Sequence, residues 1–281
     1  MPIQLYGFLC RENTLKGYKW VNLFTTSSFH DDIIVLKIHF RKGSNYMELS
    51  PFYDKKVECL CCNKAFPTTK IRSKLVKVES TDTDFCPTYS ESSVPALYYN
   101  VFVCEHCGFS FTEDFSRYFA PGTKEQILEQ ISAKWVKRSY HHERSLSQAL
   151  ETYKLALVCG TIKKEKFVTL AGIALRIAWI YRKLQNESQE QRFLKMACDQ
   201  YIESYSTEDY ASTQMSDTRV IYMIAELSRR IGDLDMATRY YSKIIESQRI
   251  GGEAKLVEMA KEQWQLVREE REKARASAEA V

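Results

Sequence analysis

The sequence predicts an α+β protein in which a small β-rich module is followed by an all-α domain of helical repeats. Two cysteine motifs of equal spacing lie within residues 47–121, together with segments of strand-like alternation. From residue 122 onward, helix-capping patterns alternate with small and aromatic residues at helical spacing. We therefore assign residues 47–121 to the β-rich module and residues 122–281 to the helical domain, which ends in a charged helix.

The first 46 residues differ from the rest of the chain. Residues 32–40 can form one strand, but no nearby segment offers a partner, and an isolated strand is marginally stable in water. We expect residues 1–46 to be a poorly ordered extension. Because the cysteine-bearing segment begins abruptly after Met47, we also expect Met47 to be the natural start and residues 1–46 to lie upstream of it.

Composition places the chain among ordinary globular proteins. Of its 281 residues, 44% are hydrophobic and 27% are charged, which excludes a wholly disordered protein, and the net charge is only +4. We find neither about 18 consecutive apolar residues nor a secretory signal pattern. Nine cysteines, an odd number, fit a reducing compartment better than a disulfide scaffold. We expect a cytoplasmic protein.

The two cysteine motifs share one eight-residue register, in residues 59–66 and 104–111. Each contains Cys-x-x-Cys, then a residue that tolerates positive φ (Asn63 or Gly108), and an aromatic residue four positions after the second cysteine. Two such knuckles supply four thiolates, the ligand set of a structural zinc ion. We predict one zinc ion held by the following four residues: Cys59, Cys62, Cys104 and Cys107.

Other roles for these cysteines are less favoured. A redox dithiol would need only one knuckle, at the start of a helix in a βαβ unit. Cys61 is an alternative partner for Cys59, but only Cys62 reproduces the register of the second knuckle. Cys86 is either an accessory ligand or a small buried residue, and we favour the second interpretation.

Within the β-rich module, residues 70–75 and 97–103 have the composition of strands. Residues 80–84 and 90–93 have that of loops. The knuckles are separated by 41 residues (104 − 62 − 1), so metal binding would close a long loop in a module with a small core.

The helical domain begins with a capping-box pattern at residues 123–126, repeated at 186–189. Gly160 and Gly232 are expected at helix ends or turns. A pattern of small and aromatic residues at positions 149–157 recurs at 237–245, with a weaker copy midway between them. The cleanest helix pair, residues 221–246, is similar to a tetratricopeptide repeat, although the period is longer than 34 residues. A generic helical bundle is the alternative.

These segments together resemble an uncharacterised bacterial family that joins an N-terminal zinc ribbon to tetratricopeptide-like helices. The resemblance rests on five motifs: Phe52–Cys62, Asp82–Tyr89, Val103–Gly108, Ala178–Arg182 and Glu226–Gly232. It covers residues 47–268 and leaves residues 1–46 outside. The resemblance implies the architecture and no particular activity.

Catalysis has little support in the sequence. The motif starting at His142 begins like a zinc-protease site but has Leu146 where the second histidine must stand. Phosphate-binding loops and nucleophile elbows are absent. A zinc ion with four thiolate ligands has no open position for water. We expect a protein that is not an enzyme.

Two binding functions remain. Zinc ribbons often bind nucleic acid, and a basic stripe with Phe66 nearby is formed by Lys70, Arg72, Lys74 and Lys77. Residues 47–121, however, contain eight basic and ten acidic residues, which disfavours counterion release. The favoured function is an adaptor whose helical groove binds a protein or peptide. Four arginines are expected to bind carboxylates of that partner: Arg176, Arg182, Arg229 and Arg230. Surface salt bridges with Glu226 or Asp233 are the alternative for any one of them.

Overall fold

The computed structural model describes residues 12–15, 18–21, 49–247 and 253–279. The chain divides into two compact units, residues 1–50 and 51–281. In the first unit, strands β1 (Glu12–Leu15) and β2 (Tyr18–Val21) form an antiparallel hairpin with Glu12 opposite Val21, a pairing that the sequence did not predict. The strand expected at residues 32–40 and the start expected at Met47 lie outside the described residues.

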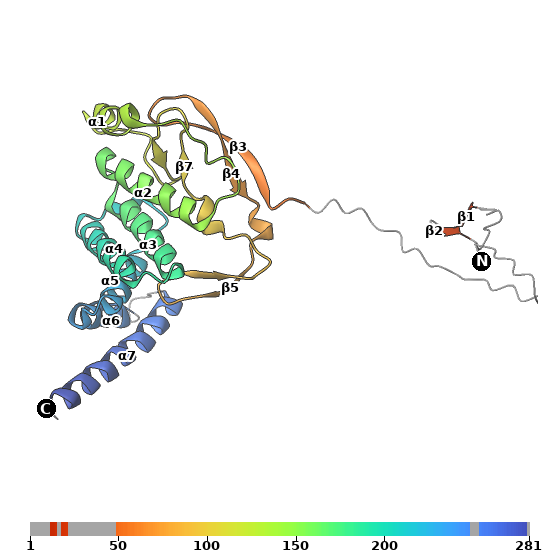
Figure 1. Cartoon of the computed structure of the whole chain (residues 1–281). Coiled ribbons are helices and arrows are strands. Elements are labelled where there is room, and N and C mark those ends of the chain that lie inside the picture. Colours follow the sequence, from red (N-terminus) through yellow and green to blue (C-terminus); the bar gives the residue numbers. More distant parts are fainter. Residues whose placement is uncertain (1–11, 16–17, 22–48, 248–252, 280–281) are drawn as a thin grey trace, which may run out of the picture. The chain divides into compact units, whose positions relative to one another are not determined.

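In the second unit the β region consists of three antiparallel hairpins (Figure 1). Their strand pairs are β3 (Phe52–Glu58) with β4 (Ala65–Ile71), β5 (Val78–Thr81) with β6 (Pro87–Tyr89), and β7 (Phe102–Val103) with β8 (Ser110–Phe111). Glu58 pairs with Ala65 and Val103 pairs with Ser110. Each cysteine knuckle therefore forms the closed end of a hairpin.

Two expected strands differ from the structure. The strand expected at residues 70–75 ends at Ile71, and a 3₁₀ turn, η1 (Ser73–Leu75), follows it. The strand expected at 97–103 is replaced by a 3₁₀ turn, η2 (Ala96–Tyr99), before the short β7.

Side chains explain the second difference. The Leu97 amide donates to the Tyr89 hydroxyl at 3.1 Å, and the Tyr153 hydroxyl donates to the Leu97 carbonyl at 2.8 Å. Arg144 donates to the Tyr98 carbonyl at 3.1 Å. The backbone groups that a strand would pair with another strand are thus taken up by side chains.

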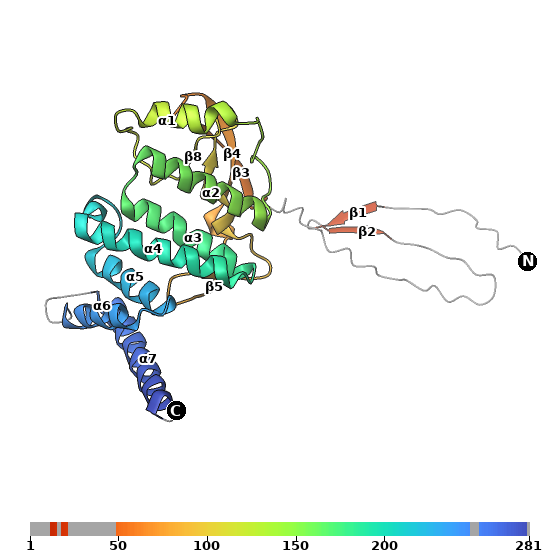
Figure 2. The same ribbon diagram turned by 60° about the vertical axis from the view of Figure 1, so that its left-hand side comes forward.

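Seven α-helices lie in the described part of the second unit. They are α1 (Thr123–Gln130), α2 (Leu146–Lys163), α3 (Phe167–Lys183), α4 (Glu187–Thr207), α5 (Asp217–Arg230), α6 (Leu234–Ser247) and α7 (Ala254–Glu279). Two 3₁₀ turns, η3 (Ser132–Lys134) and η4 (Asp209–Ser212), follow α1 and α4. From α2 to α7, each helix packs against the next one along the chain, as Figure 2 shows. Among the helices that the structure describes, none combines the length and the apolar composition that a membrane span requires.

The helix N-termini match the capping patterns predicted from the sequence only in part. Asn186 caps α4 by accepting from the Gln189 amide at 3.2 Å, which is one half of the capping box predicted there; the Asn186 amide donates instead to the Tyr181 carbonyl at 3.0 Å. Thr123 is instead the first residue of α1, where its hydroxyl donates to the Ala120 carbonyl, so the capping box expected there is wrong. A capping box that was not predicted joins Ser145 and Gln148 at the start of α2.

The β region and the helices share one core. Gly160, expected at a helix end, lies inside α2, where an added Cβ would come within 2.9 Å of Leu170 and 3.0 Å of Phe115. The glycine therefore allows close contact of α2 with α3 and with the β region. The turn expected at Gly232 does separate α5 from α6, with φ of 84°.

Candidate functional site

The two cysteine knuckles have the same backbone geometry. The amide of Asn63 donates to the Cys59 carbonyl at 2.9 Å, and the amide of Gly108 donates to the Cys104 carbonyl at 2.8 Å. Asn63 has φ of 57° and Gly108 has φ of 73°. The positive φ predicted at both positions is confirmed. The positive φ turns the backbone of each knuckle tightly enough for both of its cysteines to face the same point.

The second knuckle is further fixed by an indole. Trp135 donates its Nε1 hydrogen to the Glu105 carbonyl at 3.0 Å. An added Cβ on Gly108 would lie 2.5 Å from the Trp135 ring, a separation that real side chains do not reach. Gly108 is therefore required by its backbone conformation and also by this close packing.

The four predicted ligands lie together. Cys59 Sγ is 3.6 Å from Cys107 Sγ, and Cys62 Sγ is 3.7 Å from Cys104 Sγ. All four sulfurs lie within 4.8 Å of one another. A tetrahedral zinc ion with bonds of about 2.3 Å would separate its sulfur ligands by about 3.8 Å. The arrangement therefore fits a metal ion with four thiolate ligands.

The thiols of this group hydrogen-bond to one another, and these contacts move the pKa values of two of them in opposite directions. A hydrogen bond with Cys107 raises the pKa of Cys104 to about 12. Hydrogen bonds from Cys104, Cys59 and Cys61 in turn hold the pKa of Cys107 below its ordinary value. Sulfurs this close cannot all be thiolates unless a positive charge offsets their repulsion, which a divalent ion would do.

The remaining cysteine alternatives are placed by the structure. Cys61 is buried beside Cys107 but is not a member of the four-sulfur group. Cys86 is also outside the group: its amide donates to Asp84 Oδ1 at 3.1 Å, in the loop after β5. The accessory-ligand role considered for Cys86 therefore has no support in this geometry, and Cys86 is a buried residue.

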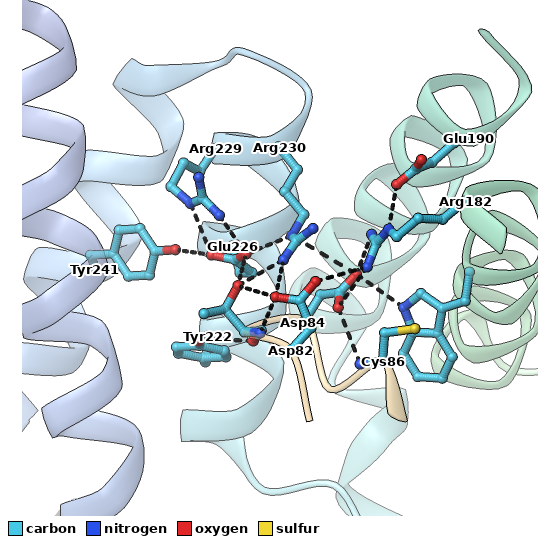
Figure 3. A network of polar contacts seen from close by, with 12 residues as sticks. Asp82, Asp84, Cys86, Arg182, Glu190, Tyr222, Glu226, Arg229, Arg230 and Tyr241 are labelled. Atoms are coloured by element: carbon cyan, nitrogen blue, oxygen red, sulfur yellow. Dashed lines mark hydrogen bonds and ion pairs between the residues drawn. The ribbon is translucent and has the colours of Figure 1, made fainter. Parts of the chain in front are cut away.

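Three of the four arginines expected to bind a partner contact carboxylates of the chain itself. Arg182, in the last turn of α3, binds Asp84 with Nη2 2.7 Å from Oδ2. Arg230, in the last turn of α5, binds Asp82 at 2.8 Å. Figure 3 shows both guanidinium groups directed toward the loop that joins β5 to β6. The β5–β6 loop (residues 82–86) thus binds to the ends of α3 and α5.

A buried glutamate completes this network. Glu226 on α5 has no exposed surface and accepts from Arg229 at 2.8 Å and Arg230 at 2.6 Å. Its carboxylate also accepts from the Thr83 hydroxyl and the Tyr241 hydroxyl, both at 2.6 Å. The predicted alternative, a salt bridge with Glu226, is therefore correct for Arg229 and Arg230, but the pairs are partly buried rather than on the surface.

Burial and charge act against each other in this network. Burial alone would raise the pKa of Glu226, but the hydrogen bonds and charges of Arg229 and Arg230 outweigh it and lower that pKa. At Asp82, burial is likewise outweighed by the Thr83 amide and by Arg230, so its pKa is also lowered. Both groups therefore favour their charged form in the folded protein.

A family model described as "Uncharacterized protein conserved in bacteria (DUF2225)" matches residues 52–267. The chain belongs to the DUF2225 family. The match covers the knuckles, the β5–β6 loop and the arginine network, as the resemblance implied. No curated protein and no solved structure matches the chain significantly.

Two arginines of this DUF2225 member line a cavity, and only the first of them was singled out from the sequence. Arg176 forms no ion pair with any described residue; its Nη1 donates to the Gly172 carbonyl at 2.9 Å, and its side chain lines a cavity. Arg219, which the sequence did not single out, lines the same cavity and stacks over the Phe85 ring at 4.4 Å. Sequence offered no signal for Arg219, because its surroundings come from the distant β5–β6 loop.

Proposed function

We propose that this protein is a non-enzymatic zinc-binding adaptor whose tetratricopeptide-like helices bind a protein or peptide partner. The zinc ion would have a structural role, because four sulfur ligands leave no position for a reactive water. It would fix two hairpins against each other and so hold the β region on the helices. Loss of the ion would then destabilise the fold rather than abolish a reaction.

The observation that carries this proposal is the acidic loop held against α3 and α5. Arginines at the ends of these two helices bind Asp82 and Asp84 in a segment that is distant in sequence. The charge at the end of each helix is well placed, because helix C-termini favour cations. Arginines of α3 and α5 thus bind carboxylates, and an arginine of α3 without such a partner has the chemistry to bind an acidic segment of another protein.

Arg176 is the residue best suited to such a partner. It lies on α3, as Arg182 does, but it has no carboxylate partner among the described residues. Arg182, Arg229 and Arg230 are already paired within the chain, so we assign them to holding the β5–β6 loop in place. We therefore reduce the predicted partner contacts to Arg176 and its surroundings.

Nucleic-acid binding remains the alternative and is less well supported. Phe66, which would have to stack on a base, is 1% exposed and packs against Phe111, with ring centroids 6.4 Å apart. Lys70 pairs with Glu113 at 3.4 Å and lies over the Phe102 ring. Phe66 is therefore not available to stack on a base, and Lys70 is already paired.

The adaptor is tested by capture of partners from a bacterial lysate with the full-length chain, with and without nuclease. Arg176→Glu is the test variant, and Arg192→Glu, on the exposed surface of α4, is the matched control. The expected result is a nuclease-resistant protein that wild type and Arg192→Glu retain and Arg176→Glu loses. Recovery of nuclease-sensitive material alone, or equal capture by both variants, would contradict the proposal.

A further inference from the structure

A cavity of about 570 Å³ lies between the β region and the helices α3 and α5. Its volume is within the range of pockets that hold small ligands. Its α3 wall includes Thr169, Gly172, Arg176 and Trp179, which the three- and four-residue spacing places on one face of that helix. The cavity is separate from the four-sulfur group, none of whose members lines it.

Two arginines face this cavity without a carboxylate partner among the described residues. Arg176 extends from α3 and donates only to a backbone carbonyl of its own helix. Arg219 extends from the first turn of α5 and lies over the Phe85 ring. Burial raises the pKa of Tyr201 in the cavity wall, and the charges of both arginines act to lower it. The charges of both guanidinium groups therefore act on one buried phenol.

Gly172 makes room for one of these groups. An added Cβ at this position would lie 3.0 Å from Nη1 of Arg176. The glycine therefore leaves the space in which the guanidinium of Arg176 folds back along α3. The remaining N–H groups of that guanidinium stay available to a ligand. Such a planar cation suits the two oxygens of a carboxylate or a phosphate.

The other charges around the cavity leave an excess of positive charge. Of the three acidic residues in its wall, Asp84 is bound by Arg182, and Glu113 is bound by Lys55 and Lys70. Asp114 accepts from the Thr112 hydroxyl. Lys166 donates to the Ser212 hydroxyl, so it adds a third cation that no described carboxylate neutralises. Three cations therefore face one unpaired carboxylate, that of Asp114.

Apolar side chains form part of the remaining wall, beside polar residues of η4 and of the segment after it. Phe85 comes from the β5–β6 loop, Trp179 from α3 and Met223 from α5. Trp179 donates its indole hydrogen to Asp84 at 3.0 Å, which fixes the ring in place. A cavity with apolar walls and a few oriented polar groups is typical of a small-molecule site.

We propose that this cavity binds an oxyanion, a carboxylate or a phosphate, carried on an apolar body, with Arg176 and Arg219 as the anion-binding residues. This proposal deepens the proposed function, because it names the chemical group that Arg176 binds. It rests on the proposed function only for the identity of the molecule that carries this group. The apolar body packs against Phe85, Trp179 and Met223.

The test is calorimetric titration of the full-length chain with four probes. Benzoate and phenyl phosphate carry the two oxyanions on an aromatic ring, benzamide is the neutral counterpart of benzoate, and inorganic phosphate lacks the apolar body. The variants are Arg176→Gln, Arg219→Gln and the control Arg192→Gln, whose side chain is exposed on α4 outside the cavity. Equal melting temperatures would show that the variants fold.

Wild type and Arg192→Gln are expected to bind benzoate or phenyl phosphate, and whichever binds more tightly identifies the oxyanion. Arg176→Gln and Arg219→Gln should each weaken that binding about tenfold or more, since hydrogen bonds to charged groups contribute this much. Benzamide should not bind, and inorganic phosphate should bind more weakly than phenyl phosphate.

Absence of binding by both aromatic anions up to about 10 mM would overturn the inference, as would equal binding by all variants. These outcomes can be told apart from failure of the adaptor. If Arg176→Glu fails to capture a partner that wild type captures, and neither anion binds, the adaptor function is supported and the oxyanion site is not. Anion binding without any captured protein would leave the oxyanion site and remove the adaptor.

Discussion

Asp84 and Arg182, which are 98 residues apart in the chain, form an ion pair with Nη2 2.7 Å from Oδ2. The pair connects the β5–β6 loop to the last turn of α3. The Asp84 side chain has no exposed surface and also accepts from Trp179 and from the Cys86 amide. A carboxylate with this many donors is satisfied although it is buried. The loop is therefore a fixed part of the helical domain's surface.

Asp84→Ala should destabilise the fold strongly. The substitution leaves the Trp179 indole without its acceptor and removes one of the carboxylates that balance Arg182. Because Arg182 keeps Asp82 and Glu190 as partners, we expect a loss of about 2–3 kcal/mol, the cost of leaving a buried donor unsatisfied. Urea unfolding measures this change. Asp199→Ala removes an exposed partner of Lys195 and should cost less than about 1 kcal/mol. Similar losses of unfolding free energy in the two variants would show that the buried network stabilises the fold no more than an exposed ion pair does.

Stability should fall in acid because of Glu226. Its pKa in the folded protein is held below the ordinary 4.5, so its contribution is present above that pH. The contribution is lost as the pH falls through the lowered folded-state pKa. In urea midpoints measured from pH 7 down to pH 3, Glu226→Gln should show a smaller decrease than wild type. Asp82 retains its own dependence in the same direction. Parallel curves for the two proteins would contradict this assignment.

Gly108→Ala should be more harmful than Gly122→Ala. Both glycines have positive φ, 73° and 77°, so alanine carries a backbone penalty of about 1–2 kcal/mol at each. At Gly108 the new methyl group would also meet the Trp135 ring at 2.5 Å, whereas nothing lies within 4 Å at Gly122. The difference in free energy of unfolding between the two variants isolates the packing at the second knuckle. Equal losses would mean that Trp135 moves aside freely.

The sequence predicted local features well and distant contacts poorly. The equal spacing of the knuckles was enough to predict which four cysteines meet, because Asn63 and Gly108 set the same turn in both. The turn at Gly232 followed in the same way. Of the strand expected at 97–103 only Phe102–Val103 forms, because the side chains of Tyr153 and Tyr89 hydrogen-bond to the backbone of Leu97.

The arginines illustrate the same limit. Their preference for carboxylates follows from the residue type, and the structure places carboxylates beside three of them. Which carboxylates these are depends on how the β5–β6 loop packs against α3 and α5. No local pattern specifies that packing, so the chain's own Asp82 and Asp84 could not be told from those of a partner.

A zinc ion held by four sulfurs is tested most directly by the zinc content of the purified chain and of two neighbouring variants. Cys62→Ala removes a member of the four-sulfur group, and Cys61→Ala removes the adjacent buried thiol that is not a member. We predict one zinc ion per chain in wild type and in Cys61→Ala, and loss of zinc with a lower melting temperature in Cys62→Ala. Wild-type protein without zinc, or zinc that is lost from Cys61→Ala and kept by Cys62→Ala, would contradict the assignment.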